Sequence, residues 1–531
     1  MLEDALQKAN QLRLEGRWRE ALAGYKSLVE ALGPRAELLH NMALCELGLQ
    51  NPKAAQSLAA KALSSSPGLW QAQIVLAKSQ RQTDPTGEEA ERTLAHLCEQ
   101  VSAPQGASSK LQQTIQAHAN LERAEIALNA FCDPQSCLDL VGPLANDSTT
   151  AERARLSRLV AQLYFRNTSD KALSREACEY AGTFITKPKL RQVISHRGKQ
   201  PKLGNRRPRI GLLSPSFHAG PVYYLCYQTL ELLSEHCDLV FFSRGVRVDW
   251  ASEVFHHLAV DWHSAESLSW QQLASVMSES NLDLLLELGG WMDVEGLKAV
   301  SQLQGHPTIK WVGGQAMTTG LPVFSGFISD AWQSPASTHS LFVEPLWKMP
   351  LGYVSYQQPA FWPGPCRRRR RGSYGLIGNP SKVGIQLLPT LMKLKAQGVN
   401  RLWMIDRRYA HPRIVKRIKA DLEPSGLKLE FVTPKDHQDF LVEISKLEYM
   451  VDTRPYSAGL TAREALSLGV QIISEPGPLL FSGRHGLAAN AQQTKLLRQF
   501  SSSTDEARQN HVAQQLAQRI RKTIQAEERA N

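Results

Sequence analysis

Three polar clusters in the last third of the chain have residue types that suit a nucleoside diphosphate. The clusters are Asn379–Lys382, Lys435–His437 and Gly459–Glu464. A lysine such as Lys382 could neutralise the negative charge of a diphosphate. Each cluster follows a short β-rich run, so all three are expected just beyond the ends of strands. The sequence therefore predicts one anion-binding site assembled from several strand ends.

The third cluster leads into an expected helix over Ala462–Leu468. Gly459 and Thr461 would place backbone N–H groups and a hydroxyl at the start of that helix, where an anion is favoured. Glu464, one turn further, could accept hydrogen bonds from ribose hydroxyls. His437 opens a helix as well. A Gly/Thr loop before a helix is more often a simple cap, so the prediction depends on the recurrence of such residues at successive strand ends.

These clusters need an α/β scaffold, and the chain after Arg209 alternates β-rich runs with amphipathic stretches. The first series of runs is Arg209–Phe217, Asp238–Ser243, Leu282–Leu288, Thr308–Val312 and Phe324–Ser329. The second series is Tyr374–Ile377, Arg401–Ile405, Lys428–Val432, Tyr449–Asp452 and Gln471–Ser474. Such alternation predicts parallel sheets covered by helices. We therefore expect two Rossmann-like lobes, over 209–365 and 366–531, with the site where the strand ends of the lobes face each other.

Residues 1–186 lack strand-like alternation and are rich in helix-forming residues. Ala21, Tyr25, Leu28 and Pro34 recur about 34 residues later as Ala55, Ala59, Ala62 and Pro67, and a third copy gives Ala90, Leu94 and Leu97. This pattern resembles the tetratricopeptide repeat and predicts an α-solenoid of two to three repeats. Such arrays usually present a concave surface to a partner protein, although a short array can also serve only to pack against the next domain.

The charge of the chain is concentrated in two short segments. The net charge is +11, but Lys187–Arg209 holds nine Lys/Arg and no acid, and Arg367–Arg371 adds five more. The remaining residues therefore sum to −3, because 11 minus 14 is −3. We interpret residues 187–208 as a basic linker and the arginine run as a connector between the lobes. A protein that binds nucleic acid through a broad basic surface is disfavoured.

Cysteine usage and hydropathy predict a soluble cytoplasmic protein. The eight cysteines are scattered without the CxxC spacing of zinc sites, which favours free thiols in a reducing compartment. The first ten residues have no apolar signal-peptide core. No apolar run approaches the length of about 18 residues that a membrane-spanning helix needs.

Residues 209–486 resemble the O-linked N-acetylglucosaminyltransferase family, which includes bacterial protein glycosyltransferases. The matching stretches are Arg209–Ser214, Leu284–Gly290, Lys310–Gly320, Met349–Pro359, Tyr374–Lys382, Phe431–His437 and Asp452–Gly469. Tetratricopeptide repeats in front of such a module fit the same family. The resemblance implies the GT-B fold, in which two lobes face each other. It also implies transfer of a sugar from a UDP-sugar to a protein side chain, with no cofactor and no required metal.

The resemblance assigns a role to several residues. Lys382 matches the lysine that contacts the donor diphosphate, and Asn379 lies in the same loop. Lys435 and His437 match basic and uracil-side positions. Thr461 matches a phosphate-binding hydroxyl that would act together with the helix start at Gly459, and Glu464 matches a ribose-contacting acid. The implied partners are the UDP-sugar and an acceptor protein selected with the help of the repeats.

Two motifs depart from the family pattern. The family loop Asp-Phe-x-x-His-Pro is Ser216–Pro221 in this chain, so that its histidine falls on Gly220. His218, two residues earlier, is the candidate acceptor-side catalytic group. The family's Gly-Gly-Thr-Thr or Gly-His-Thr-Thr run is Ala458–Thr461 in this chain, which loses one hydroxyl.

These departures leave two other interpretations open. The chain could be a non-catalytic adaptor whose repeats bind a partner and whose degenerate transferase module retains nucleotide binding. It could also bind nucleic acid through Arg367–Arg371, although that run lacks interleaved aromatic residues and a nucleic-acid motif.

Overall fold

The computed structural model describes residues 2–102, 109–146, 150–165, 169–185, 206–303, 306–313, 317–475 and 483–530. It divides into two compact units, Met1–Gln162 and Leu163–Asn531. The division falls earlier than the predicted boundary at residue 186, and most of the predicted basic linker 187–208 lies outside the described residues. None of the helices in the described ranges is both long and apolar enough to cross a membrane.

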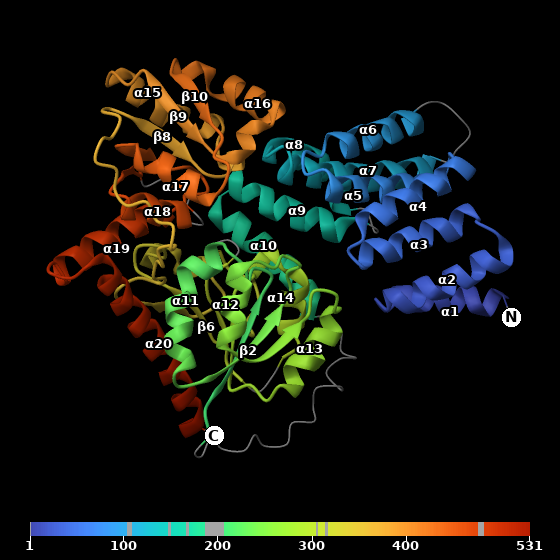
Figure 1. Ribbon diagram of the computed structural model, residues 1–531, viewed down its shortest axis with the longest axis horizontal. Coiled ribbons are helices and arrows are strands. Elements are labelled where there is room, and N and C mark those ends of the chain that lie inside the picture. Colours follow the sequence, from blue (N-terminus) through green and yellow to red (C-terminus); the bar gives the residue numbers. More distant parts are fainter. Residues whose placement is uncertain are drawn as a thin grey trace. The chain divides into compact units, whose positions relative to one another are not determined.

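The first unit is built from helices that pack in sequence order (Figure 1). They are α1 (Leu2–Leu14), α2 (Trp18–Leu32), α3 (Ala36–Gly48), α4 (Pro52–Ser65), α5 (Trp70–Thr83), α6 (Glu88–Ser102), α7 (Ser109–Asn129) and α8 (Pro134–Val141). A further helix, α9 (Ala151–Tyr164), begins in this unit and ends in the second.

The residues of the predicted repeat form the core of this solenoid. Ala21, Ala55 and Ala90 are all 0% exposed, because a small side chain at this place lets the two helices of a pair approach closely. Pro34 and Pro67 lie in the connections that follow α2 and α4, where a proline prevents the helix from continuing. The three predicted repeats correspond to the pairs α1–α2, α3–α4 and α5–α6, which confirms the α-solenoid.

The first lobe of the second unit contains an all-parallel seven-stranded sheet with the order β3-β2-β1-β4-β5-β6-β7. Its strands are β1 (Arg209–Ser214), β2 (Asp238–Ser243), β3 (Ala259–Ser264), β4 (Leu284–Glu287), β5 (Thr308–Lys310), β6 (Gly326–Ser329) and β7 (Leu346–Lys348). The helices of this lobe are α10 (Asp170–Ile185), α11 (Pro221–Ser234), α12 (Trp250–Leu258), α13 (Trp270–Glu279) and α14 (Val294–Val300). Strands β3 and β7, which the sequence did not predict, are the two edge strands.

The second lobe contains an all-parallel five-stranded sheet with the order β10-β9-β8-β11-β12. Its strands are β8 (Tyr374–Ile377), β9 (Arg401–Ile405), β10 (Lys428–Val432), β11 (Tyr449–Val451) and β12 (Gln471–Ile473). Its helices are α15 (Leu388–Ala396), α16 (Pro412–Leu422), α17 (His437–Ser445), α18 (Leu460–Ser467) and α19 (His485–Gln499). All five predicted strands are present, and the two Rossmann-like lobes are confirmed.

The C-terminal helix α20 (Asp505–Ala530) returns to the first lobe, although the sequence prediction grouped it with the second. Val512, Leu516, Ile520 and Ile524 are spaced by four residues and form an apolar stripe along one face of the helix. This stripe belongs to the same hydrophobic core as Ile210 of β1, and α20 lies against α11 (Figure 1). The chain therefore crosses between the lobes more than once.

Candidate functional site

The polar residues of the second lobe gather where the strand order of its sheet reverses. Beginning at β8, the chain adds β9 and β10 on one side and β11 and β12 on the other. In open parallel sheets this reversal creates a crevice beyond the carboxyl ends of the strands, where ligands bind. Asn379–Lys382 follows β8 and Asp452–Thr461 follows β11. Two of the predicted clusters thus flank this crevice.

Lys382 lies at the end of a short 3-10 turn that begins after β8. Asn379 caps the turn, because its Oδ1 accepts a hydrogen bond from the backbone N–H of Ser381 at 2.9 Å. The Lys382 ammonium donates to the carbonyl of Ser457 at 3.1 Å and lies 4.0 Å from the centre of the Tyr456 ring. Burial lowers the pKa of Lys382 to about 7, although the Asp452 carboxylate favours the charged form. Within the described part of the chain, no carboxylate is in direct contact with this ammonium.

Asp452 shapes the loop that carries these partners. It is 7% exposed and accepts hydrogen bonds from the hydroxyls of Ser457 and Ser474, each at 2.6 Å, and from the N–H of Ala458 at 2.9 Å. Burial raises the pKa of Asp452, and these donors oppose that rise. At Gly486 in α19, a Cβ atom would lie 2.2 Å from Asp452 Oδ2, so the close approach of α19 requires glycine there. Asp452 therefore organises the loop through these hydrogen bonds.

Gly459 and Thr461 lie at the start of α18 as predicted. Gly459 is the N-cap residue and offers no side chain to cap the helix, which leaves the first N–H groups of α18 open to an anion. The Thr461 hydroxyl lies beside Gly378 at the end of β8, 3.6 Å from where a Cβ on that glycine would be. Gly378 has a φ of +101°, a backbone conformation that favours glycine. The hydroxyl and the helix start are thus close to the β8 side of the crevice.

The structure brings His437 and Glu464 together. His437 Nε2 lies 2.7 Å from Glu464 Oε1, and Glu464 is 2% exposed. The hydroxyl of Tyr224, from α11 of the first lobe, lies 3.3 Å from His437 Nδ1. A neutral His437 that donates from Nε2 can accept from Tyr224 at Nδ1. Lys435, by contrast, is exposed, and its backbone N–H donates to Asp439.

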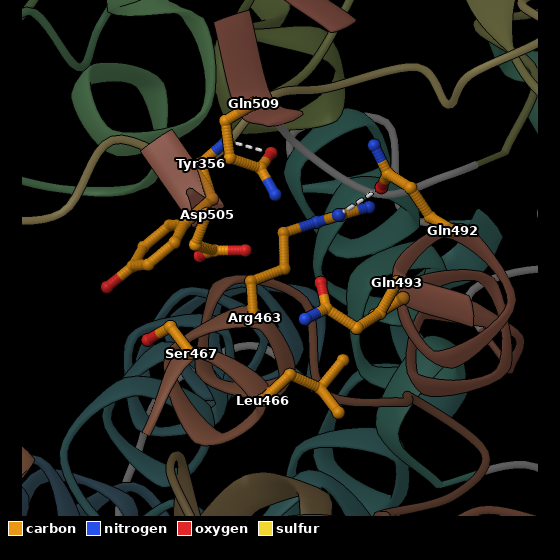
Figure 2. A pocket seen from close by; sticks show the side chains of 9 residues that line it. Tyr356, Arg463, Leu466, Ser467, Gln492, Gln493, Asp505 and Gln509 are labelled. Carbon is orange, nitrogen blue, oxygen red and sulfur yellow. Dashed lines mark hydrogen bonds between the residues drawn. The ribbon is translucent and has the colours of Figure 1, made fainter. Parts of the chain in front are cut away.

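A small pocket is lined by residues of α18, α19, α20 and the segment around Tyr356 (Figure 2). Arg463 extends into it and donates to the Gln492 side-chain oxygen. Gln492 in turn donates to the carbonyl of Val354 at 3.0 Å, and Gln509 accepts from the N–H of Tyr356 at 3.0 Å. The bonds through Gln492 connect α18, the helix that carries Glu464, to Val354 of the first lobe.

His218 is not joined to the residues of the second lobe by the contacts that the structure gives it. Its Nδ1 lies 3.2 Å from the carbonyl of Ala219. The loop is anchored by Asp249, whose two carboxylate oxygens accept from the N–H of Ala219 at 2.9 and 3.1 Å. Burial opposes ionisation of Asp249, but the N–H groups of Ala219 and Ala251 lower its pKa overall. His218 thus lies in a well-held loop of the first lobe.

The functional surroundings include aromatic residues and one histidine that the sequence did not single out. Tyr224 contacts His437, Tyr456 covers Lys382, and Tyr164 stacks on Tyr456. His485, at the start of α19, lies 3.1 Å from the hydroxyl of Tyr353. Aromatic residues and single histidines have no spacing signal of their own, so only the three-dimensional arrangement reveals them.

No protein-family model matches the chain, but comparison with known proteins finds several relatives. A probable UDP-N-acetylglucosamine–peptide N-acetylglucosaminyltransferase SPINDLY of Petunia hybrida is 23% identical over 343 residues, which are 62% of this chain and 36% of the relative. The protein of the same name from Hordeum vulgare is 24% identical over 344 residues, with the same two coverages. The chain therefore spans about a third of the length of the curated relatives that it matches.

Among solved structures, a variant of the Thermobaculum terrenum O-GlcNAc transferase has the same fold. It superposes with a TM-score of 0.60 at 20% sequence identity, over 100% of this chain and 93% of that one. The likeness covers the helical repeats and both lobes. It agrees with the α-solenoid followed by two Rossmann-like lobes that the sequence predicts.

Proposed function

The chain is a distant relative of the O-linked N-acetylglucosaminyltransferase family, and on this premise we propose that it is a protein glycosyltransferase. It moves a sugar, GlcNAc or a hexose, from a UDP-sugar to a Ser/Thr or Asn side chain of a protein. The observation that carries the proposal is the position of Lys382, a half-buried cation at the strand-order reversal of the second sheet. A diphosphate is the ligand that such a cation suits.

The donor nucleotide lies along the carboxyl edge of the second sheet in this proposal. Lys382 holds the diphosphate, and the hydroxyl of Thr461 with the N–H groups that follow Gly459 completes the anion site. Glu464 accepts from the ribose hydroxyls, and its bond to His437 at 2.7 Å keeps the carboxylate oriented. His437 and Lys435 serve the uracil side. Asn379 supports the turn that presents Lys382.

The transfer step forms a bond between the acceptor oxygen or nitrogen and the anomeric carbon of the sugar. The bond from that carbon to the β-phosphate oxygen breaks, the acceptor loses a proton, and UDP leaves with one additional negative charge. Lys382 and the start of α18 stabilise this charge as it develops. Because they supply the positive charge, we propose that transfer needs no metal, so that chelation with EDTA leaves the rate unchanged.

The acceptor side is assigned to the first lobe and the repeats. His218 is the candidate group that receives the acceptor proton, since it lies in the loop where the family has its histidine. The solenoid contributes to the choice of acceptor protein. Both assignments follow from the family relation and from the position of these segments in the sequence.

A donor panel tests the proposed function directly. The purified chain is incubated with UDP-GlcNAc, UDP-glucose and UDP-galactose and with candidate acceptor proteins, and mass spectrometry measures the added sugar. We expect incorporation from at least one donor and thermal stabilisation by UDP. A chain that UDP neither stabilises nor inhibits would contradict the assignment of the second lobe.

The adaptor hypothesis remains the second candidate because Gly220 occupies the position of the family histidine. A Cβ atom on Gly220 would lie 3.3 Å from the ring of His218, so the space of the missing side chain is partly filled by that ring. Stabilisation by UDP without sugar transfer across the panel would favour the adaptor. Loss of sugar transfer in a His218→Ala variant that still binds UDP would favour the enzyme.

A further inference from the structure

The aromatic ring that covers Lys382 is itself held by a residue far away in the sequence. Tyr456 lies on the loop after β11, and its ring centre is 4.0 Å from the Lys382 ammonium. The Tyr456 ring also stacks on the ring of Tyr164, with centroids 5.2 Å apart and planes inclined by 14°. Tyr164 is the last residue of α9, the helix that precedes both lobes. The three side chains form a continuous stack that ends on the cation.

A second contact fastens the end of α9 to the same site. The side-chain amide of Gln386 donates to the carbonyl of Tyr164 at 3.5 Å. Gln386 lies in the 3-10 turn Ile385–Leu387, a few residues after Lys382. The end of α9 is therefore attached both to the segment after β8 and to the loop after β11. These are the two segments that flank the crevice of the second sheet.

The other groups around Lys382 leave its charge largely unbalanced. His485 lies beside Tyr456, with ring centroids 5.9 Å apart, and burial lowers the pKa of His485 to about 3. It is therefore neutral near pH 7. Asp452 favours the charged form of Lys382, and Arg408 disfavours it. A charged amine in this position needs the face of an aromatic ring or an anionic ligand.

We infer that Tyr164 is a positioning residue for the donor site: stacked on Tyr456, it holds the ring that fixes the Lys382 ammonium toward the crevice. The inference rests on the proposed function for the identity of the ligand as the diphosphate of a UDP-sugar. It adds to that function a residue outside both lobes. The segment that joins the solenoid to the first lobe thereby becomes part of the donor site.

The physical argument concerns freedom of motion and water. A tyrosine on a loop can occupy several rotamers, and a stacked partner restricts it to one. With Tyr456 fixed, the ammonium of Lys382 has one position, and the ring excludes water from one side of it. Without the partner, Tyr456 gains freedom, water reaches the amine, and part of the binding free energy of the diphosphate must be used to order both side chains.

The first test measures Lys382 itself and needs no nucleotide. The protein is treated briefly with acetic anhydride over a range of pH, and peptide mass spectrometry gives the pH midpoint of acetylation at Lys382. For Tyr164→Leu we expect the midpoint to rise by about half a unit to one unit, because water that reaches the amine relieves the burial that lowers its pKa, and this outweighs the looser contact with the Tyr456 ring. Tyr164→Phe keeps the stack and should keep the midpoint.

A matched control comes from another stacked tyrosine pair of the same sheet. Tyr374 and Tyr449 stack with centroids 4.7 Å apart and planes inclined by 16°, at the amino ends of β8 and β11. Tyr449→Leu removes a comparable stack at the opposite edge of the sheet. It should leave the Lys382 midpoint unchanged. An equal shift in Tyr449→Leu and Tyr164→Leu would reflect general loosening of the lobe and would overturn the inference.

The second test measures UDP binding by calorimetry at pH 6.0 in the same variants, because Lys382 is then charged in all of them and a shift of its pKa does not alter the Kd. Tyr164→Leu should raise the Kd for UDP by about threefold to tenfold, and Tyr164→Phe should restore it. An unchanged Kd together with an unchanged midpoint overturns the inference and leaves the proposed function intact. If the unsubstituted protein binds no UDP, the proposed function fails, and the midpoint alone decides whether Tyr164 positions Lys382.

Discussion

Each of the two lobes has a lysine near the carboxyl edge of its parallel sheet, fully buried in the first lobe and half-buried in the second, and the surroundings of the two lysines differ. Lys310, the last residue of β5, is 1% exposed and lies 3.3 Å from Glu287 Oε2. Its ammonium also donates to the carbonyls of Trp311 and Val312, each at 2.7 Å. Lys382 of the second lobe has one carbonyl, that of Ser457, and the face of an aromatic ring.

We propose that this difference separates a structural lysine, Lys310, from a ligand-binding lysine, Lys382. Around Lys310 the fold supplies a carboxylate: Oε2 of Glu287 lies beside the ammonium, and its Oε1 accepts from the N–H groups of Gly289 and Gly290 at 2.6 and 2.7 Å. Burial lowers the pKa of Lys310, and Glu287 opposes this change. Among the residues that the structure describes, no carboxylate is in direct contact with Lys382, and in the proposed function a ligand supplies the balancing negative charge. A buried cation indicates a binding site only when its own fold leaves it short of anions.

The largest effect is expected from Lys382→Ala. In the proposed function this variant loses the cation that stabilises the leaving UDP, and we expect the transfer rate to fall by about 100-fold to 1,000-fold. The melting temperature should change little, because no ion pair is broken. Rate and melting temperature are measured on the same preparation. A normal transfer rate in a folded variant would show that Lys382 does not act in the transfer. The proposed difference in role between Lys382 and Lys310 would then be wrong.

Lys310→Met should have the opposite outcome. Glu287 would remain buried without its partner, and breaking a buried pair in this way costs about 3–5 kcal/mol in the free energy of unfolding. Denaturant unfolding measures the loss. The double variant Lys310→Met with Glu287→Gln should recover most of it, since no charge is left unpaired. A loss of transfer without a loss of stability in the single variant would instead place Lys310 in the reaction.

The sequence predicted the second lobe better than the first for a physical reason. All five strands of the second sheet were found as β-rich runs, whereas β3 and β7 of the first sheet were missed. Both are edge strands, and β3 is only partly buried along its length, so neither has the continuous apolar run of an interior strand. Helix α20 was grouped with the second lobe although it packs on the first. Its apolar stripe predicts that one face is buried but not which surface that face contacts.

The candidate site was predictable as far as it follows strand ends. Lys382, Thr461 and the pair His437–Glu464 lie where the order of strands and helices places them. Tyr224 and Tyr164 were not predictable, because they reach the site from an apolar helix of the first lobe and from the end of α9. Their roles depend on contacts between segments that are far apart in the sequence. The local spacing of residue types carries no information on such contacts.

A smaller and graded effect should appear in the pH dependence of UDP binding. The pKa of Lys382 is about 7 without a ligand, and a bound diphosphate favours the charged amine and raises that pKa. Binding above pH 7 therefore takes up a proton, and the Kd should rise by about tenfold per pH unit until the pKa of the complex is reached. The phosphate groups are already ionised in this range.

The control for this pH profile is Lys382→Arg, whose guanidinium stays charged throughout. Its Kd should be nearly independent of pH between 7 and 9. Calorimetry in two buffers of different ionisation enthalpy would count the proton taken up. A flat profile in the unsubstituted protein would mean that Lys382 is charged before UDP binds, and that the fold balances it as it balances Lys310.

The smallest effect is expected from the exposed part of the arginine run. Arg369 donates to the carbonyl of Leu468 at 2.7 Å, and Arg370 lies over the ring of Trp403 at 4.1 Å. These two arginines therefore hold the second lobe together, and only Arg367, Arg368 and Arg371 are exposed. Solvated cations are screened by salt and contribute little to a site that is not in contact with them.

Replacement of the three exposed arginines by glutamine should change the Kd for UDP by less than about twofold at 150 mM salt. The slope of log Kd against log salt concentration should stay the same. If the slope falls, these arginines attract the anionic donor or an acidic acceptor from a distance, and cations at the joint of the lobes would join Lys382 in serving the ligand. If the slope does not fall, the exposed arginines do not contribute to UDP binding. A cation of the second lobe then contributes only where it is at least partly buried and has no carboxylate of the described residues in direct contact.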